Sequence, residues 1–356
     1  MRNTDWLATM DKKHKLRLGI VGCGAAAERC HLPAIVRQSS FELVGLVDSC
    51  LLNAERLLGK YRDLSGDGSQ IKVTTRPQDL HGIVDAVIIA TPHNTHQELT
   101  EAFAGMGIHC LVEKLMALSS IECKRMIETA ITNNITLGVA HVRRQFPGSK
   151  WIKEVINESR IGNIEKIVWK EGAPYDWPLL SPSLFRKEIS GGGVIADSGP
   201  HIIDLLLWWF GSDNVQIESC CDTSLGGAES EALVQLAING VRIEIELSRL
   251  RFLDNSCKLY GREATIEIGL DTVAEFRWLD RAGREVATGV VPEETSAEEQ
   301  WELCFVDQLE NFAAAVKGET ELFVTGYDGL RTVEVIQSCY KASTHVQHPW
   351  RNVVGI

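Results

Sequence analysis

The chain has 356 residues, more than one hydrophobic core usually holds, so we expect two domains. Hydrophobic residues make up 44% of it and charged residues 24%, which is the composition of a soluble globular protein. Its net charge of −12 disfavours contact with phosphate backbones and anionic lipid, which argues against nucleic-acid and membrane partners. The polar residues 1–15 lack the apolar segment of a signal peptide, so we expect a cytoplasmic protein.

Ten cysteines are spread along the chain without a Cys-x-x-Cys pair. In a chain with room for a large core, this pattern favours reduced, mostly buried thiols. We therefore expect neither a disulfide framework nor a zinc site.

The first 140 residues alternate short apolar runs with stretches of helical periodicity. We expect strands at 16–21, 41–47, 71–73, 85–90, 109–113 and 136–140, and helices at 25–38, 53–61, 97–106 and 119–133. Apolar runs of this kind are typical of strands that are buried on both faces. Strands that alternate with helices predict an α/β domain built on a doubly wound parallel sheet.

The turn after the first strand has the pattern G-x-G-x-x-A, which here reads Gly22-Cys23-Gly24-Ala25-Ala26-Ala27. Gly22 allows a tight turn, Gly24 lets the backbone approach a pyrophosphate, and Ala27 keeps the helix close to the sheet. The phosphates would lie at the helix N-terminus, where the backbone N–H groups of Ala25 and Ala26 have no helical partner. The sequence therefore predicts a Rossmann dinucleotide-binding domain over residues 14–140.

Asp48 ends the second strand, where an acidic residue accepts hydrogen bonds from the adenosine ribose hydroxyls. Its charge would repel a 2′-phosphate, and no arginine follows it directly. We therefore expect NAD as the preferred cofactor, with NADP possible.

Polar residues also follow the later strands. Thr91, Pro92, His93 and His96 come after the strand at 85–90 and are expected to line the cofactor site. The H-x-x-H spacing of the two histidines has no third ligand nearby, so we expect no metal.

Glu113 and Lys114 come directly after residues 109–112 of the strand expected at 109–113, and the carboxyl ends of parallel strands face the ligand crevice. Farther along, three consecutive glycines at 191–193 allow either a close approach to a ligand or an unusual turn. A helix starting near Asp197 would place Asp197, His201 and Asp204 on one face. His201 could be a ligand-facing histidine or a core histidine bonded to one of the two aspartates.

These features, in this order, resemble the glucose–fructose oxidoreductase / inositol dehydrogenase / rhizopine catabolism (Gfo/Idh/MocA) family. The resemblance extends from about residue 16 to residue 345. It rests on the glycine turn, the Thr91-Pro92 loop with His96, the Glu113-Lys114 pair, and the glycine block with the following Asp-x-Gly-x-His-x-x-Asp. It implies an NAD(P)-dependent oxidoreductase that acts on CH–OH groups.

The resemblance also implies roles for individual residues. Lys114 matches the catalytic lysine of the family and would stabilise the developing alkoxide. His201 would be the acid or base for the substrate hydroxyl, since an unperturbed pKa of about 6.5 suits proton transfer at neutral pH. Asp197 would orient the substrate and the imidazole. Leu115 departs from the family pattern, which usually has proline after the lysine.

The remaining residues, 141–356, are expected to form a catalytic, substrate-binding and oligomerisation domain. Strands at 164–170, 215–222, 232–238, 241–248, 257–260 and 264–268, with Asn239-Gly240 as a hairpin turn, predict an α+β domain with an open, largely antiparallel sheet. The loop at 175–187 carries aromatic, hydroxyl and cationic groups, and we expect Trp177 and Arg186 to contact the substrate. By resemblance, the outer face of the sheet would make a homodimer or homotetramer.

Two functional hypotheses follow. The first is an enzyme that transfers a hydride between the nicotinamide and a secondary alcohol or ketone of a sugar, nucleotide sugar or cyclitol. A dihydrodiol dehydrogenase-like enzyme is the alternative within this class. The second is a non-catalytic member that senses a dinucleotide or sugar, which would not need Lys114, Asp197 and His201 together.

Overall fold

The computed structural model describes residues 15–66, 70–178, 182–211, 213–224, 227–292 and 295–346. The expectation for the N-terminal segment, and residues 179–181 of the predicted substrate loop, lie outside these ranges. Contacts divide the chain into two compact units. Unit 1 contains the described residues up to 117 together with 121–140 and 305–329, and unit 2 contains 118–120, 141–304 and the described residues from 330 onward.

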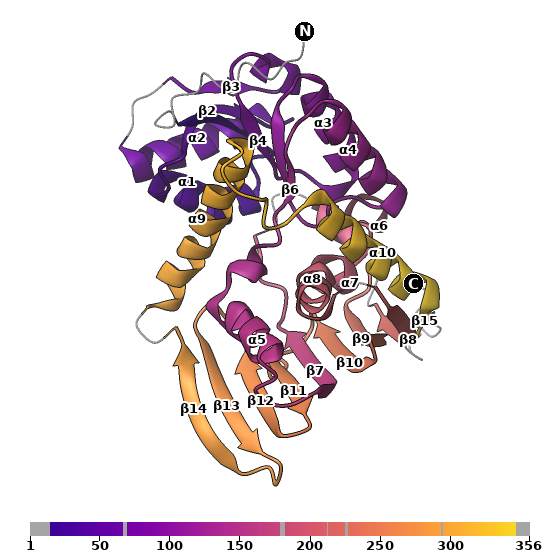
Figure 1. Ribbon diagram of the computed structural model, residues 1–356. Coiled ribbons are helices and arrows are strands. Elements are labelled where there is room, and N and C mark those ends of the chain that lie inside the picture. The colour runs from indigo at the N-terminus through magenta and orange to yellow at the C-terminus, as the bar shows by residue number, and fades with distance from the viewer. Residues whose placement is uncertain are drawn as a thin grey trace. The chain divides into compact units, whose positions relative to one another are not determined.

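Unit 1 is built on a six-stranded parallel sheet in the order β3-β2-β1-β4-β5-β6. Its strands are β1 (Leu16–Val21), β2 (Phe41–Val47), β3 (Lys72–Thr74), β4 (Ala86–Ile89), β5 (His109–Val112) and β6 (Leu137–Val139). The helical segments of this part of the chain are η2 (Ala27–His31), α1 (Leu32–Arg37), α2 (Leu51–Ser65), η3 (Pro77–Leu80), η4 (His93–Thr95), α3 (His96–Gly105) and α4 (Ser120–Thr132). Helices lie on both faces of the sheet (Figure 1). The predicted Rossmann architecture is confirmed.

The first helix differs from a regular α-helix. Residues Ala27–His31 form a π-helical turn, in which the backbone N–H of Leu32 donates to the carbonyl oxygen of Ala27, five residues back. Pro33, in the first turn of α1, has no N–H and leaves one i→i−4 bond unmade. The wider turn ends at His31, whose side chain is completely buried.

Unit 2 is built on a nine-stranded sheet in the order β14-β13-β12-β11-β7-β10-β9-β8-β15. Its strands are β7 (Ile164–Gly172), β8 (Val215–Thr223), β9 (Glu231–Ile238), β10 (Val241–Ser248), β11 (Ser256–Gly261), β12 (Ala264–Gly269), β13 (Ala274–Asp280), β14 (Glu285–Val291) and β15 (Ser343–His345). Among these described strands, the pairs β7–β10 and β8–β15 are parallel and the others antiparallel. The predicted open, largely antiparallel sheet is therefore confirmed.

The helical segments of unit 2 are η5 (Val142–Gln145), α5 (Pro147–Asn157), η6 (Pro182–Phe185), α6 (Lys187–Ser190), α7 (Val194–Asp197) and α8 (Gly199–Phe210). Helices α5 and α8 lie against one face of the sheet, as Figure 1 shows. On that face the indole rings of Trp169 and Trp209 pack with their centroids 6.1 Å apart. The predicted hairpin turn is also present, with Asn239 and Gly240 both at positive φ.

Two long helices, α9 (Ala297–Val316) and α10 (Gly326–Ala342), contribute residues to both units. In unit 1, Phe312 of α9 stacks on Phe41 of β2 with 6.1 Å between the ring centroids. None of the helices in the described ranges combines the length and the apolar character needed to cross a bilayer.

Candidate functional site

The glycine turn of unit 1 has the geometry that a dinucleotide requires. Gly22 has a φ of 92°, and a Cβ there would lie 2.6 Å from the backbone of Ala90, so the position needs glycine. A Cβ added at Gly24 would meet no atom within 4 Å, which leaves open space beside the turn. Ala25 and Ala26 follow as the first helical residues. These residues fit a pyrophosphate at the helix N-terminus.

Asp48 lies directly after β2 and is hydrogen-bonded to the glycine turn. One carboxylate oxygen accepts the Cys23 N–H at 2.8 Å, and the other accepts the Cys50 N–H at 2.8 Å. The same oxygen that binds Cys50 lies 3.3 Å from the Asn53 amide nitrogen. Both carboxylate oxygens of Asp48 are therefore held by backbone N–H groups.

A basic side chain does lie near this turn, although none follows Asp48 directly in the sequence. Arg56 of α2 donates to the Cys23 carbonyl oxygen at 3.1 Å and pairs with Glu28 at 2.5 Å. Lys60 also pairs with Glu28, at 2.6 Å. Glu28 thus partly neutralises both cations.

His96, which was predicted to line the cofactor site, joins two loops of unit 1. It is completely buried, with Nε2 2.9 Å from the Thr91 carbonyl oxygen and Nδ1 3.0 Å from that of Leu115. It thereby connects the loop after β4 to the loop after β5. His93 is also buried, and its ring lies 5.6 Å from that of His96. In the described part of the chain, no cluster of three His, Cys, Asp or Glu side chains is placed to bind a metal.

Beside them, Thr91 is half-buried, and its hydroxyl lies 2.7 Å from that of Thr95. Pro92 is exposed, and its carbonyl oxygen accepts the Thr95 hydroxyl at 2.7 Å. Thr95 thereby fixes the loop in which the two predicted cofactor residues lie.

Glu113 and Lys114 follow β5 in unit 1, as predicted. One Glu113 oxygen lies 2.7 Å from Nε2 of His31, and the other accepts the Lys114 N–H at 3.1 Å. Burial opposes ionisation of Glu113, but the hydrogen bond from His31 and the charge of Lys114 hold the pKa of Glu113 below its usual range. The Lys114–Leu115 peptide bond is cis, and the Leu115 side chain is buried.

The glycine block at 191–193 fits the second of the two predicted explanations, an unusual turn. A Cβ at Gly193 would overlap the backbone of Glu229, and one at Gly192 would overlap the hydroxyl of Tyr340. The Glu229 carboxylate also accepts the Gly193 N–H at 2.7 Å and the Tyr340 hydroxyl at 2.6 Å. The glycines therefore allow the Glu229 backbone and the Tyr340 hydroxyl to approach the chain at the start of α7.

Asp197 and His201 belong to unit 2, and they are not part of one continuous helix. Asp197 ends α7, and α8 begins at Gly199, because Pro200 has no N–H with which to continue the first helix. His201 lies in the first turn of α8 and is half-buried. We expected one helix to begin near Asp197. The structure instead has two helices, one that ends at Asp197 and one that begins at Gly199.

Asp197 is paired with an arginine that the sequence did not single out. Arg249, just after β10, lies 2.5 Å from the Asp197 carboxylate, and its guanidinium carbon is 5.4 Å from the centre of the Tyr175 ring. Burial, and then the charge of Asp197, raise the pKa of Tyr175 to about 12, so its hydroxyl is a proton donor at neutral pH. Neither that hydroxyl nor Arg249 Nε has a partner among the described residues.

Asp204 has a different environment. It is buried in α8 and accepts two hydrogen bonds from Arg144, at 2.9 and 2.7 Å. His141 lies 3.9 Å from the same carboxylate. Asp204 is consequently part of a buried ion pair.

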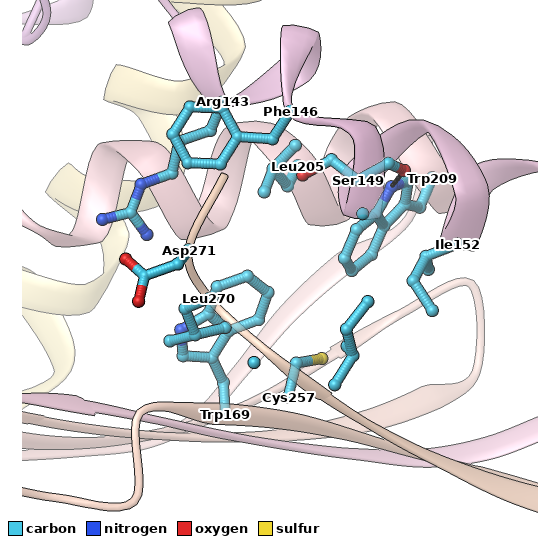
Figure 2. Close-up of a pocket in the computed structure, with 13 residues that line it drawn as sticks. Arg143, Phe146, Ser149, Ile152, Trp169, Leu205, Trp209, Cys257, Leu270 and Asp271 are labelled. Atoms are coloured by element: carbon cyan, nitrogen blue, oxygen red, sulfur yellow. Dashed lines mark hydrogen bonds between the residues drawn. The ribbon is translucent and has the colours of Figure 1, made fainter. Parts of the chain in front are cut away.

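The two other predicted substrate residues lie in the loop that leads to α7. Trp177 is half-buried, and Arg186 is exposed at the start of α6. Elsewhere in unit 2, a cavity of about 20 Å³ has Arg143 and Asp271 among its lining residues. Figure 2 shows the Arg143 side chain pointing toward Asp271. A cavity of this size holds about one water molecule and no sugar.

Two models of known families match the chain. Residues 16–141 match the "Oxidoreductase family, NAD-binding Rossmann fold", and residues 150–267 match the "GFO/IDH/MocA C-terminal domain". Oxidoreductase P35 of Formosa agariphila is 28% identical over 266 residues, which are 72% of this chain and 80% of that protein. Inositol 2-dehydrogenase of Rhizobium meliloti is 23% identical over 339 residues, 92% and 96% of the two chains.

The fold is also similar to that of a solved structure. KijD10, a 3-ketoreductase from Actinomadura kijaniata in complex with NADP and TDP-benzene, superposes with a TM-score of 0.81. The superposition covers 94% of this chain and 100% of KijD10, at 18% sequence identity.

Proposed function

The chain belongs to the Gfo/Idh/MocA oxidoreductase family, and we propose that it oxidises a secondary alcohol, or reduces the ketone, of a sugar, nucleotide sugar or cyclitol. The observation that carries this proposal is the hydrogen bond between the Cys23 N–H and Asp48, which joins the glycine turn to the acid at the end of β2. In Rossmann folds a glycine turn after the first strand binds the pyrophosphate, and an acidic residue farther along binds the adenosine ribose. The inositol dehydrogenase among its relatives supports a polyol or sugar substrate.

Three side chains would carry the reaction. The Lys114 ammonium would stabilise negative charge on the substrate oxygen, and the His201 imidazole would accept or return the hydroxyl proton. Asp197, held by Arg249, would orient the substrate. The nicotinamide, when bound, supplies the hydride chemistry. Trp177 and Arg186 are proposed substrate contacts.

We propose NAD as the preferred cofactor. Asp48 is ionisable and faces the glycine turn, and Glu28 already pairs with both Arg56 and Lys60. A 2′-phosphate would therefore meet one uncompensated negative charge and two engaged cations. Gly22, Gly24, Ala25 and Ala26 would bind the pyrophosphate. The nicotinamide side would be lined by residues of the loops after β4 and β5, namely Thr91, Pro92, His93, His96, Glu113 and Lys114.

Cofactor preference can be tested with Asp48→Asn, which keeps one acceptor oxygen and removes the charge. We expect the ratio of kcat/KM for NAD over that for NADP to fall by about 10- to 100-fold, which corresponds to about 1.4–2.7 kcal/mol. Asp63→Asn, at an exposed position on α2, is the matched control. A preference for NADP in the unmodified protein would contradict this assignment.

Residues 14–140 would bind the dinucleotide, and 141–356 would carry the substrate site and the oligomer interface. The outer face of the unit 2 sheet carries cross-strand ion pairs such as Lys166–Glu244 and Lys258–Glu267, with the exposed ring of Tyr260 among them. We propose that this face makes a homodimer or homotetramer, and that the protein is cytoplasmic.

The activity can be tested by following nicotinamide absorbance with NAD and then NADP, over a panel of free sugars, nucleotide sugars and cyclitols. Lys114→Met and His201→Asn should lower kcat by about 100-fold or more, because each removes a group that acts in the transition state. The exposed Lys72→Met and His81→Asn are matched controls and should retain activity. Dinucleotide binding without turnover on any member of the panel would instead support the sensor hypothesis.

A further inference from the structure

Behind the proposed catalytic lysine, unit 1 contains a buried histidine to which no function has been given so far. His31 ends the π-helical turn η2, and its side chain has no exposed surface. Its Nε2 lies 2.7 Å from a Glu113 carboxylate oxygen, across 82 positions of the sequence. Its ring meets that of Phe305 edge to face, with 5.7 Å between the centroids. The imidazole is thus held by packing on one side and by a carboxylate on the other.

The surroundings of the two ring nitrogens of His31 determine which of them carries the proton. Nδ1 is buried and has no partner among the described residues, whereas Nε2 faces the Glu113 oxygen. A buried N–H without an acceptor is unfavourable, so the tautomer with its proton on Nε2 is the favoured one. The Nε2–H of His31 therefore donates a hydrogen bond to the Glu113 carboxylate, and the unpartnered Nδ1 carries the lone pair.

Glu113 in turn restrains the backbone of Lys114. Its second carboxylate oxygen accepts the Lys114 backbone N–H at 3.1 Å, while the first is held by His31. With both oxygens bonded, the carboxylate cannot rotate without losing a hydrogen bond. The backbone from which the Lys114 side chain starts is consequently fixed relative to the end of β5.

We propose that His31 is a positioning residue for Lys114 and acts through Glu113. The inference rests on the proposed catalytic function of Lys114. Replacing His31 by a residue that cannot donate would free one Glu113 oxygen and release the lysine backbone from its defined place. Displacing a reacting group by about 1 Å can lower a rate by about 100-fold, so the effect should appear mainly in kcat.

The test compares three variants. His31→Leu removes the donor and approximately keeps the volume, and His31→Gln returns a side-chain N–H donor to the same region. Phe305→Leu is the matched packing control, because it changes the ring contact of His31 and leaves the hydrogen bond in place. We expect kcat to fall by about 10- to 100-fold in His31→Leu, to recover to within about threefold in His31→Gln, and to remain near the unmodified value in Phe305→Leu.

A second readout does not require turnover. The rate at which trinitrobenzenesulfonate modifies Lys114 in the protein without cofactor, followed by peptide mass spectrometry, reports the environment of the amine. We expect this rate to change at least threefold in His31→Leu and to return to that of the unmodified protein in His31→Gln. The NADH affinity and the melting temperature of His31→Leu should change much less. Equal losses in both His31 variants, or an unchanged labelling rate and kcat in His31→Leu, would overturn the inference.

Failure of the inference and failure of the proposed function give different results. If Lys114→Met retains full activity, the proposed catalytic function is wrong, and Lys114 labelling alone then decides whether His31 positions the lysine. If Lys114→Met is inactive while His31→Leu is fully active and labels normally, only the inference is wrong. The double variant with His31→Leu and Lys114→Met should be no slower than Lys114→Met alone, because His31 acts through that lysine.

Discussion

The carboxylate of Asp197 lies 2.5 Å from the guanidinium of Arg249, which stacks on the ring of Tyr175. The arginine side chain is 9% exposed and that of Asp197 is 26% exposed. This pairing fixes the direction of a carboxylate that is proposed to orient the substrate. It also connects the end of α7 to the loop after β10, which is separated from it by 52 positions in the sequence.

Arg249→Met should therefore lower kcat/KM by about 10- to 100-fold, because Asp197 loses the partner that orients it. Arg249→Lys should recover only part of the activity, since an ammonium keeps the charge but not the planar stacking on Tyr175. The matched control is Arg251→Met, two residues farther on, where an exposed arginine pairs with Glu231 and Glu246. Steady-state kinetics with one substrate would check this, and equal effects of Arg249→Met and Arg251→Met would contradict it.

The Arg144–Asp204 pair is expected to matter for stability. Both side chains are almost fully buried, and two hydrogen bonds join them. Removing one partner leaves an uncompensated buried charge, so Arg144→Met should lower the free energy of unfolding by about 3–5 kcal/mol. Replacing both by apolar residues, as in Arg144→Met with Asp204→Leu, should restore much of this loss. Urea unfolding of Arg144→Met, Asp204→Leu and the double variant would measure the coupling free energy between the two side chains.

The contact between Gly193 and Glu229 predicts that a methyl group is not tolerated. In Gly193→Ala the added carbon would overlap backbone atoms, which have no rotamer by which to move away. We expect a loss of about 3 kcal/mol or more in unfolding free energy. Gly59→Ala is the control, because a Cβ there, inside α2, would meet nothing within 4 Å. That variant should be neutral or more stable by up to about 1 kcal/mol, as thermal unfolding would show.

His109 predicts a specific loss of stability in mild acid. Burial lowers its pKa to about 4, against a smaller opposing influence of Asp85, and its Nδ1 accepts the Thr136 N–H at 2.9 Å. Between about pH 6.5 and pH 4 the unfolded chain binds a proton that the folded protein does not, so stability falls as the pH falls. Between pH 7 and pH 5 the free energy of unfolding should fall by about 2 kcal/mol from this group.

His109→Gln, which keeps an acceptor for the Thr136 N–H, should reduce this pH dependence. His81→Gln is the control, because His81 is exposed. Denaturant unfolding of the three proteins at pH 7 and pH 5 would measure the difference. An identical pH dependence in His109→Gln and the unmodified protein would show that another group takes up the proton.

In unit 1 the sequence by itself determined the succession of strands and helices along the chain, the glycine turn and the residues that follow each strand. These features are local. A strand buried on both faces needs an apolar run, and a tight turn near a phosphate needs glycine at positions such as Gly22, so both leave a direct pattern. The parallel sheet of unit 1 and the hairpin at Asn239-Gly240 follow from the same local rules.

Tertiary structure decided which groups those residues face. Asp197, His201 and Asp204 have a spacing that suggests one helix face, yet Asp197 pairs with Arg249 and Asp204 with the buried Arg144. His31 meets Glu113 across 82 positions. Such pairings depend on the path of the whole chain, which brings distant segments together only when the two sheets form. Periodicity describes the face on which a side chain lies, and only packing determines the partner that it meets there.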